Sequence, residues 1–508
     1  MTLTQVIDEV GVPADEAAGG VAGIATMPRR IRAVALPGDG IGPEIMDAVQ
    51  RMLAAAGARI DWDECEAGAG VALPGGLPGE TMDAIATAGL VLKGPLQTAL
   101  GGGGKSANVT LRKHFELFAN IRPARRLPGV VTPYADRDID LVIVRENVED
   151  LYAGIEHMQT PDVAQCLKLI SRSGSRKIAE AAFALARAQG RSRVTCASKA
   201  NIMKLSEGLF KEAFEEVAAA HPAIQSDHMI IDNLAHRLVL SPESFDVICT
   251  TNMNGDIISD LTAGLVGGLG LAPSANLGAG MALFEAVHGS APDIAGQGLA
   301  NPTALLLASL MMLRQAGLPS VAERLEHALY VTLEDGKELT PDLAGPRGID
   351  AGSTSALTDR VISNLGRRSK AVPSGSGGMP VVQEVARGRV HASTRGQVRS
   401  DAGIDVFVEF AGDVPSLVAG LKAASAGLPF TLAMVSNRGL KVYPGALPQA
   451  DFVDHWRCRF ASRAPGDELP DGVLGDLLTR ISRFARWCHV ERLQLMDGTP
   501  GFSVAQGQ

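Results

Sequence analysis

Cysteine is scarce in this sequence: 508 residues contain six cysteines. They lie far apart and no two of them form a CxxC pair, so nothing in their spacing indicates a zinc ribbon or a disulfide scaffold. Reduced cytosolic thiols are the simpler interpretation. The cysteines are Cys65, Cys166, Cys196, Cys249, Cys458 and Cys488.

Long apolar runs are also missing. No stretch of about 18 uncharged apolar residues occurs, so we predict no membrane span. Residues 1–30 have no apolar core behind a basic start and carry four acidic residues, which argues against secretory and organellar signals. We therefore predict a disordered leader over residues 1–30 and a cytoplasmic protein that does not bind membranes.

Excess positive charge is absent as well. The formal net charge of −9 argues against nonspecific nucleic-acid binding and leaves any anionic ligand to a local basic pocket. The 46% hydrophobic and 20% charged fractions are typical of a soluble globular protein. The length predicts two or three domains.

The order of elements predicts an α/β layered fold, because apolar runs typical of buried strands alternate with segments of helical period. Glycine, serine, proline and basic residues replace this pattern over residues 366–389, which we interpret as a linker. The pattern over residues 390–508 predicts a small α+β domain with the element order β-α-β-β-β-α-β, similar to ferredoxin-like or ACT-like modules.

The first candidate site is the stretch "PGDGIGPE", residues 37–44, between a predicted strand and a predicted helix. Its glycines are Gly38, Gly40 and Gly42, and this spacing does not fit the G-x-G-x-x-G dinucleotide fingerprint. A tight strand-to-helix turn would give the same pattern, so both interpretations stay open.

A second stretch, residues 101–123, brings Ser106 and Asn108 to a helix start with Arg112 one turn inside. Helix N-termini bind anions, and an arginine fork recognises carboxylates, although the first two residues could simply be helix caps. Further on, Tyr152 follows a strand end, and Lys199 lies at a strand-to-helix junction. Such residues serve as acid and base when their surroundings shift their pKa, but half-buried tyrosines and extended lysines are common without any such role.

The stretch "TTNMNGDIISDLTAGLVGGLG", residues 250–270, is the most informative. Asp256 and Asp260 are four residues apart at the start of an apolar helix, so both carboxylates lie on one face. Paired carboxylates favour a hard divalent cation, and Asp232 at the end of a predicted strand is a candidate third ligand. Acidic residues also occur at helix starts simply to complement the helix dipole.

Together, these stretches resemble, in order and spacing, the β-decarboxylating dehydrogenases of 2-hydroxy acids, the family of isocitrate and 3-isopropylmalate dehydrogenases. The resemblance runs from about residue 31 to 365, and some bacterial isocitrate dehydrogenases carry a similar C-terminal extension. It implies a non-Rossmann fold with a large cofactor-binding domain and a small domain that carries a dimer-interface clasp. The implied boundaries are 31–118 and 266–365 for the large domain and 119–265 for the small domain.

The resemblance also implies the chemistry: oxidation and decarboxylation of isocitrate to 2-oxoglutarate and CO₂, as in the tricarboxylic acid cycle. Ser106 and Asn108 favour isocitrate over an apolar substrate, because unpaired polar donors would reject the latter. Mg²⁺ or Mn²⁺ would be the metal, Lys199 the base and Tyr152 the acid. The implied substrate arginines are Arg112, Arg122 and Arg145, and the implied metal ligands are Asp256, Asp260 and Asp232. In the implied homodimer, Lys199 and Asp232 serve the partner's site.

The stretch "AVHGSAPDIAGQG", residues 286–298, is similar to the family's ribose-binding loop. NADP-dependent members carry lysine and tyrosine where this chain has Asp293 and Ile294, so we expect NAD over NADP by about 2–4 kcal/mol, through repulsion of the 2′-phosphate. Arg347 is the main objection, because a guanidinium that reached that phosphate would bind it. The predicted cofactor residues are Thr98, His288, Gly289, Ser290, Ala291, Asp293, Ile294 and Asn301.

Several alternatives stay open. The same resemblance admits an NADP-dependent enzyme or a homoisocitrate, isopropylmalate or tartrate dehydrogenase. A noncatalytic regulatory subunit is the alternative of a different class, although retention of the whole residue set argues against it. For the C-terminal domain, oligomer assembly beyond the dimer is the first hypothesis and effector binding the second.

Overall fold

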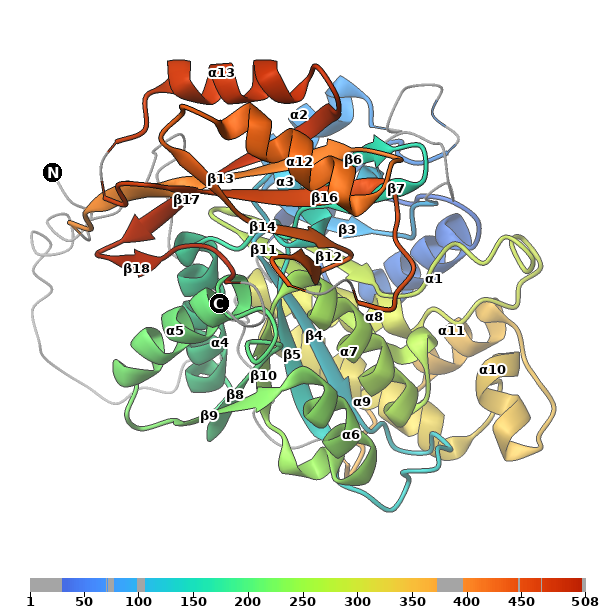
Figure 1. The fold of residues 1–508 in the computed structure, drawn as a ribbon. Helices are drawn as coiled ribbons and strands as arrows, with labels where there is room; N and C mark the ends of the chain where they lie inside the picture. Colours follow the sequence, from blue (N-terminus) through green and yellow to red (C-terminus); the bar gives the residue numbers. More distant parts are fainter. Residues whose placement is uncertain are drawn as a thin grey trace, which may run out of the picture.

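The computed structural model contains a large α/β part and a smaller antiparallel part at the C-terminus (Figure 1). The predicted leader, except for Arg30, and most of the predicted linker lie outside the residues that the structure describes. Those residues are 30–69, 71, 77–97, 106–371, 396–445, 448–466 and 468–504.

A ten-stranded mixed sheet runs through the large part. Its middle is antiparallel, and the strands toward both edges pair in parallel. In spatial order the strands are β2 (Ile60–Glu64), β1 (Ile31–Leu36), β3 (Leu90–Lys93), β12 (Met281–Ala286), β11 (Pro273–Gly278), β4 (Ala119–Arg125), β5 (Asp140–Glu146), β10 (Val247–Thr250), β8 (Arg193–Ser198) and β9 (Gln225–Ile230).

Helices cover both faces of this sheet. In β5, Val142 and Val144 belong to one apolar cluster, while Leu141 and Ile143 belong to another on the opposite face. Strands buried on both faces read as continuous apolar runs, which is why the sequence shows runs here instead of alternation. The helices of this part are α1 (Gly42–Ala55), α2 (Gly79–Ala88), α3 (Ala107–His114), α4 (Arg172–Ala188), α5 (Ser206–Ala219), α6 (Ile231–Leu240), α7 (Asn252–Val266), α8 (Thr303–Gln315), α9 (Pro319–Asp335), α10 (Pro341–Ala344) and α11 (Thr354–Ser363).

The two halves of the sheet come from different parts of the chain. Strands β1, β2 and β3 share one half with β11 and β12, which lie far downstream, whereas the other half is built within residues 119–250. Strand β4 pairs with β11 at the junction, so residues at the ends of β4 and β5 lie between the two halves. The exact domain boundaries stay a prediction.

The C-terminal part has its own core. Its antiparallel sheet has the order β15-β14-β16-β13-β17-β18, and two helices share an apolar cluster with it. The predicted order is confirmed, with one short strand, β18, added at the end. The elements are β13 (Arg399–Glu409), α12 (Val414–Ser425), β14 (Phe430–Asn437), β15 (Leu440–Tyr443), β16 (His455–Ser462), α13 (Asp471–Ile481), β17 (Arg486–Met496) and β18 (Thr499–Pro500).

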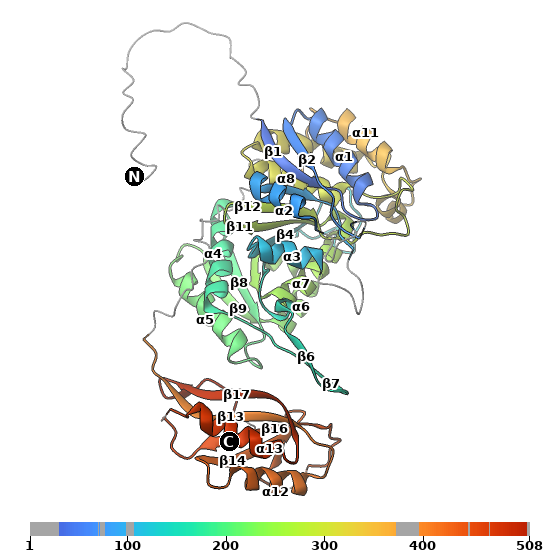
Figure 2. The same ribbon diagram turned by 90° about the horizontal axis from the view of Figure 1, so that it is seen from above.

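A hairpin of β6 (Glu156–Thr160) and β7 (Val163–Cys166) reaches from the large part toward this C-terminal domain (Figure 2). Strand β6 contacts β17, and the Thr160 hydroxyl donates a hydrogen bond of 2.8 Å to Asp454 Oδ1. The hairpin is therefore the structured connection between the two parts of the molecule.

The turn between β1 and α1 settles the open question about residues 37–44. Gly40 has a φ of +59°, and a Cβ there would lie 2.0 Å from the carbonyl oxygen of Ser290. Ile41 N–H donates to that same oxygen at 2.9 Å. The glycines thus allow a close backbone approach to the loop at residue 290, and the stretch is a tight turn instead of a Rossmann phosphate loop.

All six cysteines are free thiols. Among the described residues, no helix is both long enough and apolar enough to cross a membrane.

Replacing Gly40 by alanine tests this close approach. Gly190 is a matched control, because its φ of +63° is similar and a Cβ there meets nothing within 4 Å. We expect Gly190→Ala to cost about 1 kcal/mol of backbone strain and Gly40→Ala about 2–5 kcal/mol, since a carbonyl must also move. Thermal unfolding of both variants measures the difference, and equal shifts in Tm would contradict it.

Candidate active site

Three arginines meet between the two halves of the sheet. Arg112 comes from α3, Arg122 from β4 and Arg145 from the end of β5. The exposed fractions of Arg122 and Arg145 are 7% and 1%. Burial, together with the neighbouring arginines, lowers the pKa of both guanidinium groups, that of Arg145 to about 10. Both stay charged at neutral pH, so the site favours an anionic ligand.

Asp256 and Asp260 lie on α7 beside these arginines. Because α7 begins at Asn252, the two aspartates lie inside the helix, one turn apart, and not at its start as expected. Arg122 Nη1 lies 3.3 Å from Asp256 Oδ1 and 3.6 Å from Asp260 Oδ1, and Arg145 also pairs with Asp256. Burial opposes ionisation of Asp256, but the arginines outweigh it and lower its pKa, whereas burial raises the pKa of Asp260.

Tyr152 completes this group. It lies in a short 3-10 helix, η2 (Leu151–Ala153), and its hydroxyl donates a hydrogen bond to Asp256 Oδ2. The Arg145 guanidinium lies 5.1 Å from the centre of its ring. Burial and the bond to Asp256 raise the pKa of Tyr152. The phenol therefore keeps its proton at neutral pH and is able to act as an acid.

Lys199 and Asp232 lie elsewhere, but together. Lys199 Nζ is 2.6 Å from Asp232 Oδ1, and Asp232 stands in the first turn of α6, not at the end of a strand. Within the described part of the chain, no three carboxylate, histidine or cysteine side chains form a group suited to a metal. A single chain thus brings together two of the three predicted metal ligands, and the third stays a prediction.

Ser106 and Asn108 start α3. The Ser106 side chain does not cap this helix, which removes the simplest structural explanation for it. Asn108 Nδ2 lies 3.5 Å from the carbonyl oxygen of Leu96, while its buried Oδ1 has no hydrogen-bond partner among the described residues. A buried acceptor without a partner is costly unless a ligand or water satisfies it.

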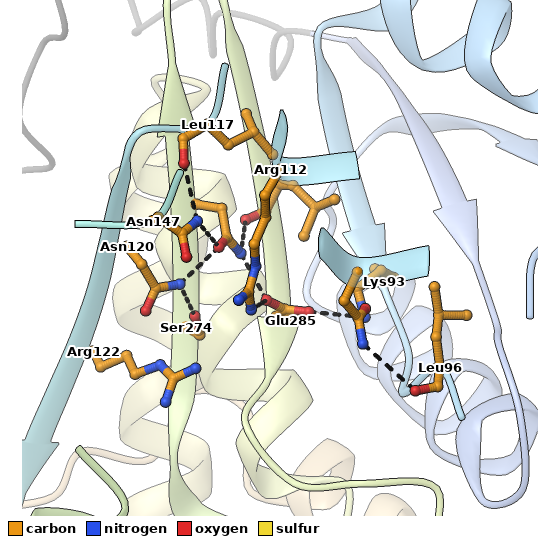
Figure 3. A network of polar contacts seen from close by, with 12 residues as sticks. Lys93, Leu96, Arg112, Leu117, Asn120, Arg122, Asn147, Ser274 and Glu285 are labelled. Atoms are coloured by element: carbon orange, nitrogen blue, oxygen red, sulfur yellow. Dashed lines mark hydrogen bonds and ion pairs between the residues drawn. The ribbon is translucent and has the colours of Figure 1, made fainter. Parts of the chain in front are cut away.

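Sequence reasoning missed the residue that holds Arg112. Glu285 on β12 is buried, with Lys93 Nζ 2.8 Å from one carboxylate oxygen and Arg112 Nη2 3.2 Å from the other (Figure 3). Burial alone would raise the pKa of Glu285, but these two cations hold it well below its usual range. Glu285 is therefore a permanent anion that fixes one of the three arginines.

Buried amides support this carboxylate from the adjacent strands. Asn276 Nδ2 donates to Glu285 Oε1 at 2.7 Å, and Asn276 Oδ1 accepts from Asn120 and Asn147 at 2.7 and 2.9 Å. Asn120 also donates to Ser274 Oγ at 2.8 Å (Figure 3). The only signal for this network in the sequence is polar residues inside otherwise apolar strands.

A pocket of about 510 Å³ lies next to this site, beside the loop that follows β12. Five predicted cofactor residues line it: His288, Gly289, Ala291, Ile294 and Asn301. Sequence reasoning missed five more: Ile41, Gly270, Leu299, Pro341 and Asp342. Ser290 and Asp293 are not part of the lining, and Thr98 lies outside the described residues.

His288 and Asn301 give this pocket its polar groups. Burial lowers the pKa of His288, so its ring is neutral at pH 7, and its buried Nε2 has no hydrogen-bond partner among the described residues. Asn301 Nδ2 donates to Asp342 Oδ2 at 2.8 Å, which fixes the amide. An apolar pocket with a few oriented polar groups is typical of a cofactor site.

Sequence comparison identifies the family. The profile of the isocitrate/isopropylmalate dehydrogenase family matches residues 32–361. The chain belongs to this family. A profile named for the C-terminal domain of bacterial isocitrate dehydrogenase matches residues 399–508. The predicted family and fold class are confirmed.

Individual relatives within this family agree with that assignment. An isocitrate dehydrogenase [NADP] of Thermus thermophilus is 52% identical over 93% of this chain and 95% of its own length. One from Rickettsia bellii is 40% identical over 93% and 98%. The mitochondrial isocitrate dehydrogenase [NAD] subunit alpha of Macaca fascicularis is 49% identical over 61% and 90%. A crystal structure of the TT0538 protein of Thermus thermophilus, 51% identical, covers 94% of this chain and 96% of its own, with a TM-score of 0.90.

The preference for NAD over NADP was wrong. The family members that match this chain over 93% of its length are named as NADP enzymes. The prediction assumed that the Asp293 carboxylate faces the ribose, but Asp293 is exposed and does not line the pocket. Two unit charges about 4 Å apart in bulk water interact by about 1 kcal/mol, and salt screens this further, so the expected 2–4 kcal/mol was too large. Arg347, the other residue considered, donates to the carbonyl oxygen of Leu333.

The pH dependence of stability offers a test at Glu146, which follows Arg145. Burial raises the pKa of Glu146 to about 7, although the N–H groups of Val148 and Glu149 donate hydrogen bonds to its carboxylate and act to lower that pKa. Since the folded-state pKa exceeds the ordinary value, the contribution of Glu146 to stability is full below about pH 4.5 and is lost as the pH rises through about 7. Relative to Glu146→Gln, the native chain should lose about 3 kcal/mol between pH 5 and 8.

Denaturant midpoints of the native chain and Glu146→Gln at pH 5 and pH 8 measure this difference. Glu215→Gln, on the exposed face of α5, is the control and should give parallel curves. Parallel curves for Glu146→Gln as well would show that its carboxylate does not titrate in this range.

Proposed function

We propose that this protein is an isocitrate dehydrogenase that converts isocitrate to 2-oxoglutarate and CO₂ while reducing NADP, with Mg²⁺ or Mn²⁺. The observation that carries the proposal is the match, at 52% identity over nearly the whole chain, to a relative named for this activity. The six free thiols favour a cytoplasmic location.

The charge of the site fits a tricarboxylic substrate. Arg112, Arg122 and Arg145 supply three largely buried guanidinium groups, and a guanidinium is able to bind a carboxylate through two N–H groups. Asn108 and Ser106 add polar groups at the start of α3. The isopropyl group of isopropylmalate would offer no hydrogen bond to these polar side chains, which disfavours that substrate.

The carboxylates of α7 fit a hard cation. Asp256 and Asp260 lie on one helix face, and both side chains remain partly exposed. Their carboxylates offer only oxygen atoms as metal ligands. When bound, Mg²⁺ or Mn²⁺ acts as a Lewis acid toward the substrate's C2 oxygen and the carboxylate beside it.

Lys199 and Asp232 serve the site of a second chain in the proposed homodimer. They pair with each other on the surface, away from Asp256 and Asp260. Beside them, Ile202 and Leu205 expose 69% and 51% of their surfaces, as expected of residues that a partner covers.

The proton steps follow from these placements. Bound NADP would supply the acceptor for the C2 hydride, and the partner's Lys199 would take the hydroxyl proton, directly or through water. The bond between C3 and its carboxyl group then breaks, and CO₂ leaves. The electron pair left on C3 takes a proton from Tyr152, whose raised pKa keeps that proton available.

Steady-state kinetics of the purified full-length chain test the function. With isocitrate and Mg²⁺ or Mn²⁺, we expect kcat/KM to be roughly tenfold or more higher with NADP than with NAD, a difference of about 1.4 kcal/mol. Homoisocitrate, isopropylmalate and tartrate should be poor substrates. Asp256→Asn is the site control and should lower kcat by about 100-fold or more, because it removes a metal ligand and the partner of Tyr152.

Each outcome separates one part of the proposal from the rest. Higher kcat/KM with NAD would contradict the cofactor and leave the substrate standing. Turnover of another substrate in place of isocitrate would contradict the substrate. Complete inactivity of the pure chain with both cofactors would favour a noncatalytic regulatory subunit.

We also propose that the C-terminal domain takes part in assembly, with effector binding as the second hypothesis. Its support is the contact of β17 with the β6–β7 hairpin, including the bond from Thr160 to Asp454, because that hairpin lies within residues 119–265, the small domain expected to carry the dimer clasp.

Deletion of residues 390–508 tests this role. We expect a smaller assembly, or a dimer with a higher dissociation constant than that of the full-length chain, because each chain loses the surface that contacts its hairpin. Light scattering gives the mass, and kinetics in parallel report any loss of regulation. An unchanged mass across the concentration range would defeat the assembly hypothesis.

A further inference from the structure

Lys168 lies in a buried cluster to which the steps above assign no role. It follows β7, and its Nζ is 2.6 Å from Asp150 Oδ1 and 2.8 Å from Glu207 Oε1. Both carboxylate side chains have an exposed fraction of 0%, and that of the Lys168 side chain is 14%. Lys168 is thus a single cation between two fully buried anions.

Asp150 anchors the turn that carries Tyr152. It has a φ of +65°, which is unusual for a residue other than glycine, and its Oδ1 accepts from Leu151 N–H at 2.7 Å. Its other oxygen accepts from Met253 N–H, in the first turn of α7, at 3.0 Å. Asp150 therefore fixes the Tyr152 turn against the helix that bears Asp256.

Glu207 anchors the loop that carries Lys199. Its Oε2 accepts from Lys199 N–H at 3.0 Å, and its Oε1 accepts from the Thr251 hydroxyl at 3.2 Å. Thr251 is the residue before α7, so this second carboxylate also meets the helix start. One carboxylate therefore connects the Lys168 ammonium group to the segment of Tyr152, the proposed acid. A second carboxylate connects it to the segment of Lys199, the proposed base.

The two anchors depend on that ammonium group. Two desolvated carboxylates repel each other, and each is stable only when paired and hydrogen-bonded. Lysine supplies a compact charge with three N–H groups, which allows it to bind two carboxylates from different segments at once. Without it, the turn and the loop would separate.

We propose that Lys168 is a positioning residue that sets the Tyr152 turn and the Lys199 loop relative to α7. It touches no substrate and acts through Asp150 and Glu207. The inference rests on the proposed function, in which Tyr152 serves one site of the dimer and Lys199 serves the other. One side chain then adjusts the acid of its own site and the base of its partner's site together.

Substitution by methionine keeps an unbranched side chain that is one atom shorter and removes the charge. In Lys168→Met, kcat with isocitrate should fall by about tenfold to 100-fold, because small displacements of acid and base have effects of this size. KM for isocitrate should change by less than about threefold, since the substrate arginines do not contact this cluster. Lys168→Arg should recover most of kcat, because a guanidinium is able to bridge both carboxylates.

Lys211→Met is the matched control. Lys211 pairs with Glu215 on the surface of α5, the same helix that carries Glu207, at 2.5 Å. It should leave kcat, KM and Tm unchanged. A loss of kcat in this control equal to that in Lys168→Met would overturn the inference.

The double variant Lys168→Met/Glu207→Gln separates positioning from folding. It removes one buried anion along with the cation, so Tm should return toward the native value while kcat stays low. Recovery of kcat in step with Tm would show that Lys168 matters for stability alone and would overturn the inference.

Hydrogen exchange in the full-length chain gives a readout that does not need activity. The N–H groups of Leu151 and Met253 report on Asp150, and that of Lys199 reports on Glu207. All three should lose protection together in Lys168→Met and keep it in Lys211→Met. Loss at only one anchor would overturn the inference, whereas an inactive native chain with joint loss of protection would overturn the proposed function alone.

Discussion

Three guanidinium groups lie close enough together that, beyond the effect of burial, Arg112 lowers the pKa of both Arg122 and Arg145. Carboxylates hold these groups in place: Glu285 binds Arg112, and Asp256 binds Arg122 and Arg145. Glu285 also binds Lys93 on β3, and the link from this carboxylate to the other half of the sheet runs through Asn276, which accepts a hydrogen bond from Asn120 on β4. The buried asparagine side chains around Glu285 form hydrogen bonds with it and with one another. This network accounts for the polar residues inside otherwise apolar strands.

The same constraint spreads outward along α7. Asp256 fixes the arginines and receives the Tyr152 hydroxyl, so the helix must hold a fixed position relative to the Tyr152 turn. The start of that helix meets Asp150 and Glu207, whose charges in turn require Lys168. Around Glu285 and around Lys168, buried carboxylates lie beside cations, and each buried charge is tolerated because of its partner.

Local patterns predicted much of this structure, and the failures have a common cause. The helix bearing Asp256 and Asp260 and the element order of the C-terminal domain follow from periodicity and spacing, which are local properties, whereas the arginines were implied by the family resemblance. Glu285, Asn276 and Lys168 were missed because a polar residue gains meaning only from partners distant in sequence. The cofactor prediction failed at Asp293 for the same reason, since exposure of a loop side chain depends on the surrounding fold. Asp232 and Lys199 lie together, but local patterns in one sequence do not show where these residues lie relative to the site of a partner chain.

The order of strands in the large sheet affects the order in which parts of the nascent chain are able to fold. Strand β3 pairs with β12, whose residues follow about 190 positions later, whereas β5, β8, β9 and β10 all lie within residues 140–250. During synthesis, the middle of the chain is therefore able to form its half of the sheet while β1 and β3 still wait for their partner. The first apolar strands to leave the ribosome are therefore among the last to be covered, and their apolar side chains stay exposed to water for longer than those of the middle of the chain.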